Sequence, residues 1–170
     1  MRFASGFTLT ELSLTIAVAA TLGLLALPGL QDLLAGSRQA SRTMAFVVSA
    51  NLARSEALRR AHPVTLCPSP DGARCARDFS AGWIVFEDLD EDGDVGGAEV
   101  VLDAYAAVGT GPARSTRTRY VWRAYGRRST NGSVTFCDPK DRSRSRAVII
   151  SYTGRPRASD RSSGGASLRC

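Results

Sequence analysis

In this chain of 170 residues, the first group of side chains that could bind a ligand is an acidic run, Glu87-Asp88-Leu89-Asp90-Glu91-Asp92-Gly93-Asp94. Its carboxylates alternate, and Glu99 is the twelfth residue counted from Asp88, which is the spacing of a calcium-binding loop. Such loops normally join two helices, whereas this run lies between two predicted strands. A solvated hairpin turn is the favoured interpretation, because short motifs often match by coincidence. The weaker alternative is a calcium site with the candidate ligands Asp88, Asp90, Asp92 and Asp94.

Arginine is the second residue type that stands out, and it is concentrated in the last third of the chain. Residues 113–170 contain fourteen Lys and Arg against three Asp and Glu, a net charge of +11, whereas residues 1–112 carry −5. The planar guanidinium group matches phosphate oxygens well. The candidate phosphate-binding arginines lie before and after the last predicted strand: Arg142, Arg144, Arg146, Arg155, Arg157 and Arg161.

Together these arginines could form one positive surface that contacts phosphates but not base edges. We would then expect nonspecific, salt-sensitive binding to DNA. Gly154 would let the backbone approach a phosphate, and Pro156 would stiffen the turn. Arg155 and Arg157 would point the same way if the segment is extended. From the residues alone, however, a solvated arginine-rich tail without a ligand is the favoured interpretation, because such tails are common.

Four cysteines, Cys67, Cys75, Cys137 and Cys170, indicate two disulfides formed in an oxidising compartment. Three pairings are possible. We favour Cys67 with Cys75, because the turn-rich residues 68–72 lie between them, which leaves Cys137 with Cys170. A zinc site is the rival interpretation, but the chain has no CxxC pair and only one histidine, His62, at a predicted helix end.

The residue types present give little support for a catalytic function. With one histidine and four cysteines that we expect to be paired, no nucleophile–base pair is evident. We therefore expect a protein that is not an enzyme and that needs no cofactor, apart from the calcium alternative.

A long apolar helix is predicted near the N-terminus. Residues 7–27 contain one charged side chain, Glu11, and a helix of this length spans roughly the 30 Å of a bilayer core. A cleaved secretory signal is one interpretation, with residues 17–19 as the cleavage site, but such signals avoid a carboxylate in the apolar stretch. In a retained membrane helix, Glu11 would be a functional group that needs a partner.

The remaining pattern predicts an α+β fold. Apolar residues at three- and four-residue steps predict an amphipathic helix over 31–62, with a possible break at Gly36 and an end at His62-Pro63. Leu33, Met44, Val48 and Leu58 belong to its expected core face. Short strands follow, and Asn131-Gly132 is a hairpin signal. The predicted strands are 64–66, 82–86, 100–102, 118–122, 133–136 and 147–152.

The N-terminal residues Gly6-Phe7-Thr8-Leu9-Thr10-Glu11 resemble the class III signal of type IV pilins and type II secretion pseudopilins. The resemblance implies that a prepilin peptidase cuts between Gly6 and Phe7 and methylates the new N-terminal residue. It also implies that Glu11 faces the N-terminal amine of a neighbouring subunit during filament assembly, and that Pro28 kinks the helix. The implied fold is pilin-like, with the long helix packed on an antiparallel β-sheet domain.

Three other stretches resemble the FimT/GspH family of minor pilins and pseudopilins: residues 67–69, 82–86 and 150–157. In the FimT branch, a GRxR motif near the C-terminus is associated with DNA binding in natural transformation. The resemblance implies that Gly154, Arg155 and Arg157 bind DNA. The alternative is a structural minor pilin, or a GspH-like pseudopilin of type II secretion, that primes filament assembly without binding DNA.

These patterns divide the chain into five segments. They are a leader peptide (1–6), a membrane and filament-core helix (7–30), an amphipathic helix (31–62), a β-rich domain (63–158) and a basic Ser/Gly tail tied by a cysteine (159–170). We expect a single-pass inner-membrane protein with a periplasmic domain that assembles into a pilus or pseudopilus. The expected partners are other pilins or pseudopilins, the prepilin peptidase, the inner membrane and DNA.

Overall fold

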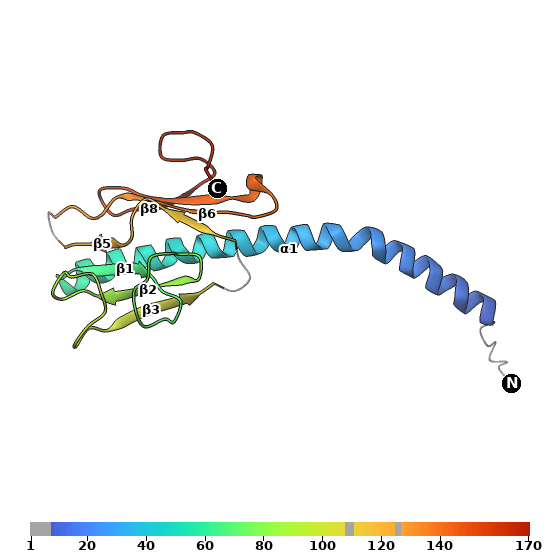
Figure 1. Cartoon of the computed structure of the whole chain (residues 1–170), viewed down its shortest axis with the longest axis horizontal. Helices are drawn as coiled ribbons and strands as arrows, with labels where there is room; N and C mark the ends of the chain where they lie inside the picture. The colour runs from blue at the N-terminus through green and yellow to red at the C-terminus, as the bar shows by residue number, and fades with distance from the viewer. Residues whose placement is uncertain (1–7, 108–110, 125–126) are drawn as a thin grey trace. The chain divides into compact units, whose positions relative to one another are not determined.

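The computed structural model describes residues 8–107, 111–124 and 127–170. It divides into two compact units, residues 1–37 and 38–170. One helix, α1 (Leu9–Arg60), contributes to both units (Figure 1). The predicted break at Gly36 is wrong, since α1 is helical through this position. A single glycine inside a long helix costs only about 1 kcal/mol, which neighbouring good helix formers offset.

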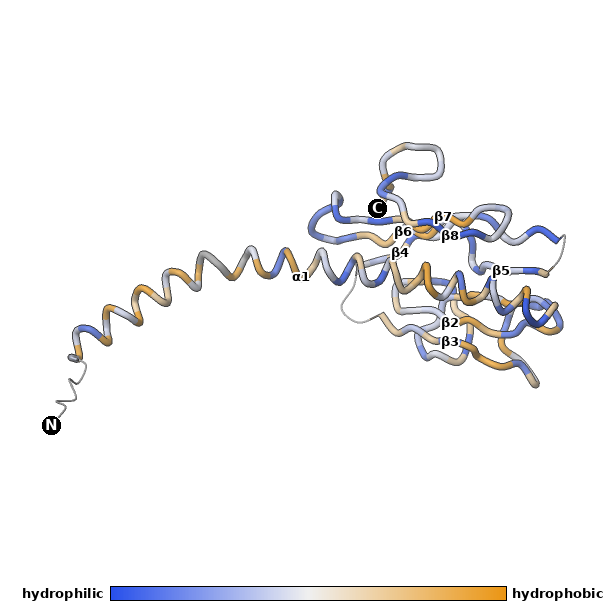
Figure 2. Tube along the Cα trace, turned by 180° about the vertical axis from the view of Figure 1, so that it is seen from behind, coloured by the Kyte–Doolittle hydropathy of each residue, from blue (hydrophilic) through white to orange (hydrophobic). Residues whose placement is uncertain are grey.

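The N-terminal part of α1 is long and apolar enough to cross a membrane, judged by length and composition. Hydrophobic residues recur along it (Figure 2). Its large apolar side chains are exposed in the structure, for example Leu9, Leu14 and Leu24. Such exposure indicates that this segment is covered by an apolar environment that the chain itself does not supply.

The second unit contains two four-stranded antiparallel sheets within the described residues. The first sheet has the order β3-β2-β1-β5 and the second has the order β4-β6-β7-β8. The strands are β1 (Val64–Pro68), β2 (Gly82–Glu87), β3 (Val101–Ala106), β4 (Ala113–Ser115), β5 (Tyr120–Trp122), β6 (Gly132–Phe136), β7 (Arg146–Ile150) and β8 (Pro156–Ser159), with a short 3-10 helix, η1 (Arg142–Arg144), before β7. Neither β4 nor β8 was predicted from the sequence, because both strands are short and contain few apolar residues.

The predicted hairpin at Asn131-Gly132 is wrong. Gly132 begins β6 in the second sheet, whereas the preceding strand, β5, belongs to the first sheet. The chain crosses from one sheet to the other here, so the turn signal marks a change of sheet.

Phe46 of α1 is the centre of the core, and its ring makes edge contacts with both sheets. The ring centroids lie 5.0 Å from Trp83 of β2 and 5.6 Å from Phe136 of β6. Phe79, in the loop before β2, packs on the same ring at 5.7 Å. All four side chains are buried. This helix segment therefore fixes the two sheets relative to one another through aromatic packing.

The face of α1 that packs on the sheets is not the predicted one. Its buried positions recur at three- and four-residue steps but, apart from Phe46, are small or polar: Gln39, Arg42, Thr43, Ser49, Ala50, Ala53 and Ala57. The expected core residues Leu33, Met44, Val48 and Leu58 are exposed. Small side chains let the helix approach the sheets closely, and this selects a face that a hydrophobicity pattern does not find.

Arg42 illustrates how the polar side chains of that face bind the rest of the domain. Its guanidinium group donates to the carbonyl oxygens of Gly111 at 2.6 Å, Phe79 at 3.0 Å and Ser80 at 3.0 Å. The same group lies 4.5 Å from the ring centroid of Phe136. Burial lowers the pKa of this guanidinium, but the three carbonyls provide acceptors for the charged form.

Two disulfides join the cysteines in the favoured pairing. Cys67 pairs with Cys75 across a loop with a sequence separation of 8, and Cys137 pairs with Cys170 with a separation of 33. The second bond ties the last residue of the chain to the end of β6. The tail also has regular structure of its own, because β8 extends to Ser159 and Arg161 forms an isolated bridge with Ser167.

Candidate nucleic-acid interface

The turn between β7 and β8 positions the arginines of the Gly154-Arg155-Pro156-Arg157 segment. Pro156 is buried at the start of β8. Arg155 lies opposite Ser151, whose backbone amide donates to the Arg155 carbonyl oxygen at 3.2 Å. Side chains alternate along an extended segment, so Arg155 and Arg157 leave the sheet on the same side. This arrangement is the one expected from the sequence.

Arg155 and Arg157 are the two exposed side chains of that segment. Within the described part of the chain, neither guanidinium has a hydrogen-bond or ion-pair partner. An unpaired arginine at a surface keeps its full charge and its planar set of donors for an external anion. The segment therefore presents two exposed guanidinium groups that no other described residue binds.

Gly154 has a packing role that the sequence did not predict. Its φ of +73° is a conformation that other residues adopt rarely, and a Cβ atom there would lie 2.6 Å from Trp122 Cδ1. Trp122 Nε1 donates to the Gly154 carbonyl oxygen at 2.8 Å. Gly154 is buried, so packing against this indole by itself requires a glycine at this position.

The arginines before β7 lie at the opposite end of that strand, near the Cys137–Cys170 disulfide. Arg144 Nε donates to Asp138 Oδ2 at 3.0 Å. Arg146 donates to the carbonyl oxygens of Ser143 at 2.8 Å and Ser145 at 2.9 Å. These guanidinium groups are engaged within the domain and hold the loop in place.

The predicted arginines therefore do not form one cluster. β7 has five residues, and at about 3.3 Å per residue it separates the two groups. Arg161, which follows β8, lies beyond the end of β7 that carries Arg146, and it donates to the Gly165 carbonyl oxygen at 3.2 Å. Arg142 is exposed at the same end. We call these two regions the disulfide end and the turn end of β7.

Other arginines reach the turn end from the connection between β5 and β6. The Arg128 guanidinium lies 5.9 Å from the ring centroid of Tyr152. Arg54, Arg123 and Arg127 border a groove of about 190 Å³ next to the same tyrosine. Sequence reasoning missed these arginines, because only the packing of Gly154 on Trp122 brings the two connections together. The adjacent pair Arg127-Arg128 was the one available signal.

Glu91 of the acidic loop neutralises part of this charge. It accepts hydrogen bonds from Arg127 Nη1 at 2.6 Å and from Arg123 Nε at 3.1 Å. Hydrogen bonding from Arg127, and then from Arg123, holds the pKa of Glu91 below its ordinary value of 4.5. The Glu91 carboxylate is thus charged at neutral pH and pairs with Arg123 and Arg127, whereas Arg155 and Arg157 have no such partner among the described residues.

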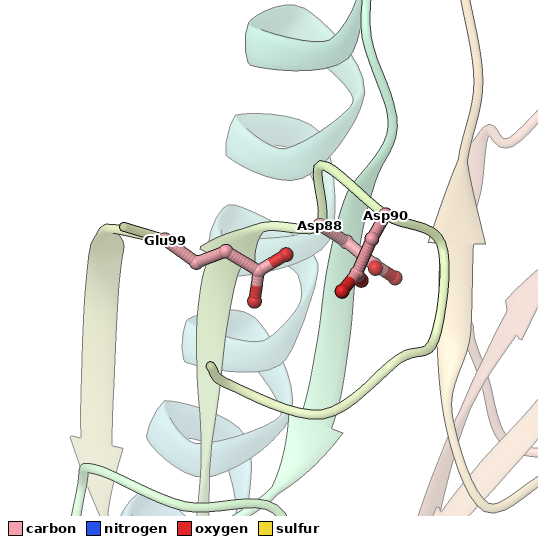
Figure 3. Close-up of side chains that lie close together, drawn as sticks. All are labelled: Asp88, Asp90 and Glu99. Carbon is pink, nitrogen blue, oxygen red and sulfur yellow. The ribbon is translucent and has the colours of Figure 1, made fainter. Parts of the chain in front are cut away.

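The acidic loop brings three carboxylates together, Asp88, Asp90 and Glu99 (Figure 3). One oxygen from each lies within 4.8 Å of the others. The predicted candidates Asp92 and Asp94 are not part of this group, and Glu99 takes their place. The loop also lies between two strands of one sheet, β2 and β3, as expected for the hairpin interpretation.

Loop amides and a threonine hydroxyl already bind these carboxylates. Asp88 is buried and accepts from Thr65 Oγ1 at 2.6 Å and from the Gly93 amide at 3.2 Å. Glu99 accepts from the amides of Leu89 at 2.7 Å and Gly96 at 3.0 Å. These bonds hold the loop together and occupy part of the acceptor capacity of Asp88 and Glu99.

The predicted N-terminal site lies partly outside the described residues. Gly6 and Phe7, the proposed cleavage and methylation site, belong to the part that the structure does not describe. Glu11 is exposed in the first turn of α1. Its backbone amide donates to Thr8 Oγ1 at 3.3 Å, so Thr8 caps the start of the helix.

Comparisons with known proteins agree with the architecture. The sequence model of the family described as "Type II transport protein GspH" matches residues 42–154. No curated protein sequence is significantly similar to the chain. Two crystal forms of the type IV minor pilin FimU from Pseudomonas aeruginosa (strain PAO1) have similar structures.

The first FimU structure is 17% identical and has a TM-score of 0.58, with 72% of this chain and 89% of FimU covered. The second is 18% identical with a TM-score of 0.55, covering 70% of this chain and 90% of FimU. At 17% and 18% sequence identity, the structural similarity to FimU establishes that the two proteins share a fold. The long helix on an antiparallel domain is thus the type IV pilin fold, as predicted.

Proposed function

The chain belongs to the GspH family of pilin-like proteins, and we propose that it is a minor pilin that joins a type IV pilus and binds extracellular DNA for uptake in natural transformation. The observation that carries the DNA-binding role is the pair Arg155 and Arg157, which is exposed and unpartnered within the described residues. Gly154 and Pro156 are both buried and hold the turn that presents this pair. The protein has a binding role and not a catalytic one in this proposal.

The expected binding is nonspecific. The arginines meet phosphates and sugars, which are identical along any DNA. Each phosphate contact releases counterions, so affinity falls as salt rises. No base-reading element is needed for a protein that captures DNA of any sequence.

Filament assembly is the second part of the proposal. Cleavage between Gly6 and Phe7 by a prepilin peptidase would create a positive N-terminal amine. Glu11 would then pair with the amine of an adjoining subunit, which lowers the cost of a carboxylate in the membrane. The exposed apolar residues Met44, Val48 and Leu58 of α1 support packing against other pilins.

An electrophoretic mobility shift assay tests the DNA-binding role. Its sample is a fragment that begins at about residue 35, because the unit 38–170 contains its own aromatic core and both disulfides. The fragment should shift duplex DNA at low salt and release it as salt rises. The double variant Arg155→Gln/Arg157→Gln should lose at least roughly tenfold in affinity and reduce the salt slope by about 2.

The matched control is Arg142→Gln/Arg161→Gln, which removes the same charge at the disulfide end. It should lower affinity less than the turn-end variant. If the wild-type fragment fails to shift DNA at low salt, or if both variants weaken binding equally, the turn end is not a DNA site. A structural minor pilin or type II secretion pseudopilin that primes assembly then becomes the better proposal, and the exposed apolar face of α1 favours it.

A further inference from the structure

We propose that the groove beside Tyr152 is a subsite for an unpaired nucleobase, so that the protein binds single-stranded DNA through both its phosphates and one base. This inference rests on the proposed DNA-binding function and specifies its ligand. The groove has a volume of about 590 Å³ and is bordered by Ile149 and Ile150 at the end of β7. Its lining includes Arg117, Asn131, Ser133, Ser151 and Tyr152.

Tyr152 is the aromatic side chain of this site. It is 62% exposed, whereas the neighbouring Trp122 is buried in the core. Its ring borders this groove and also the smaller groove lined by Arg54 and Arg123. An exposed aromatic ring offers a stacking surface that any base can use, because every base has a π face.

The Arg128 guanidinium, 5.9 Å from the Tyr152 ring centroid, adds a cation next to the stacking position. A cation over an aromatic ring is attracted to the ring electrons and restricts where the ring can move. The tyrosine is therefore partly held in place before any ligand arrives. A stacking surface that is already ordered loses less conformational entropy on binding.

The polar lining of the groove suits a base edge. Asn131 offers an amide that both donates and accepts, and Ser133 and Ser151 offer hydroxyl groups. The Ser151 hydroxyl lies 2.8 Å from Thr153 Oγ1 and accepts from the Arg155 amide at 3.2 Å. These neutral groups can rearrange to match different bases, so the subsite should have little preference among them.

Charged groups flank the groove at the positions where phosphates would lie. Arg117 is part of the lining, and its Nε donates to the Asn131 carbonyl oxygen at 3.2 Å. Arg155 follows Tyr152 by three residues. A nucleotide with its base on Tyr152 would thus have cations available for its phosphates. In a duplex the bases are already stacked and paired, and so the groove favours single strands.

Fluorescence anisotropy with the full-length chain in a non-ionic detergent tests this subsite. The two probes are a labelled 15-nucleotide oligothymidine and an abasic 15-mer, which has the same phosphates but no bases. Wild-type protein should bind oligothymidine roughly 5- to 100-fold more tightly than the abasic strand, which is the usual effect of stacking one base. Tyr152→Ala should remove this difference without weakening binding to the abasic strand, and Tyr152→Phe should keep it.

The outcomes separate the two proposals. If wild-type protein binds both strands equally, or if Tyr152→Ala weakens binding to both, the base subsite is overturned while phosphate binding stands. If neither strand binds at low salt, the DNA-binding function itself is overturned, and the subsite with it. Tyr152 is largely exposed, and unchanged melting temperatures of both variants would show that they are folded.

Discussion

The two ends of β7 carry similar numbers of arginines but use them differently. At the disulfide end, Arg144 and Arg146 bind a carboxylate and backbone carbonyls of their own loop. At the turn end, Arg155 and Arg157 are exposed without a partner among the described residues. The number of arginines in a sequence therefore overstates the charge that is available to a ligand. What matters is which guanidinium groups the fold already uses.

Arg155 and Arg157 are not needed to hold the turn between β7 and β8, because other groups stabilise it. The Gly154 carbonyl oxygen accepts from Trp122 Nε1, and Pro156 is buried at the start of β8. No guanidinium is needed to hold this backbone. At the disulfide end, by contrast, the loop of residues 138–145 is held by an arginine. Disrupting the groups that stabilise each end should therefore affect stability in different ways.

The largest effect is expected from Gly154→Ala. The new Cβ atom would clash with Trp122 Cδ1 at 2.6 Å, and alanine would be forced into a φ of +73°. Strain of this kind combined with overpacking costs about 2–5 kcal/mol. We expect the melting temperature to fall by roughly 10 °C, measured by circular dichroism. DNA binding should fall with it, because the turn no longer presents Arg155 and Arg157 correctly.

Gly164→Ala is the matched control, because a Cβ atom there would meet nothing within 4 Å. It should leave the melting temperature within about 1 °C of wild type. Equal stability of Gly154→Ala and wild type would show that the turn is not held by its contact with the indole. The contrast between the two ends would then lose its structural basis.

A smaller effect is expected from Arg144→Gln at the disulfide end. The variant leaves the Asp138 carboxylate, whose side chain is 7% exposed, without its ion-pair partner. Losing the partner of a buried charge costs about 1–3 kcal/mol. DNA binding should change little, because this guanidinium already binds within the domain. Thermal unfolding and a mobility shift measured on the same sample would check both expectations.

The pH dependence of this variant follows from Asp138. Burial alone would raise its pKa, but the amides of Asp141 and Lys140 and the Arg144 guanidinium outweigh burial and hold the pKa below 3.8. A lowered pKa stabilises the folded state above pH 3.8, and this contribution is lost as the pH falls through the lowered value. The difference in melting temperature between wild type and Arg144→Gln should therefore shrink below about pH 4.

The exposed neighbour Arg142 provides the control for that experiment. Arg142→Gln removes the same charge from the same 3-10 helix, and its stability should stay within about 0.5 kcal/mol of wild type. If both variants were equally destabilised, the cause would be the loss of net charge in this helix and not the pair with Asp138.

The sequence predicted the fold well where a short motif or an alternating pattern determines it. The long N-terminal helix, most strands and the pairing of the cysteines follow from apolar runs and from the turn-rich loop after Cys67. The packed face of α1 could not be predicted, because it is formed by Ala50, Ala53 and Ala57 together with the buried Arg42. Apolar periodicity pointed instead to side chains such as Met44 and Val48, which are exposed in the single chain.

Only part of the candidate site could be predicted, because the rest depends on contacts between residues that are distant in the sequence. Arg155 and Arg157 could be identified from a local motif, since their alternation depends only on an extended backbone. The role of Gly154 could not, because it depends on Trp122, which is 32 residues away in the sequence. The same long-range contact brings Arg128 and Tyr152 together. Local sequence thus identified the cations, but tertiary packing determines which of them are neighbours.

The smallest effect on stability is expected from adding calcium, which tests whether the carboxylates of the acidic loop are available to a cation. If its carboxylates were free, calcium would stabilise the fold by about 2.7 kcal/mol at one hundred times its dissociation constant. Asp88 and Glu99, however, already accept hydrogen bonds from a hydroxyl and from loop amides. We therefore expect the same melting temperature in calcium and in a chelator. A rise of several degrees in calcium that is lost in Glu99→Gln would show that the loop is a cation site after all.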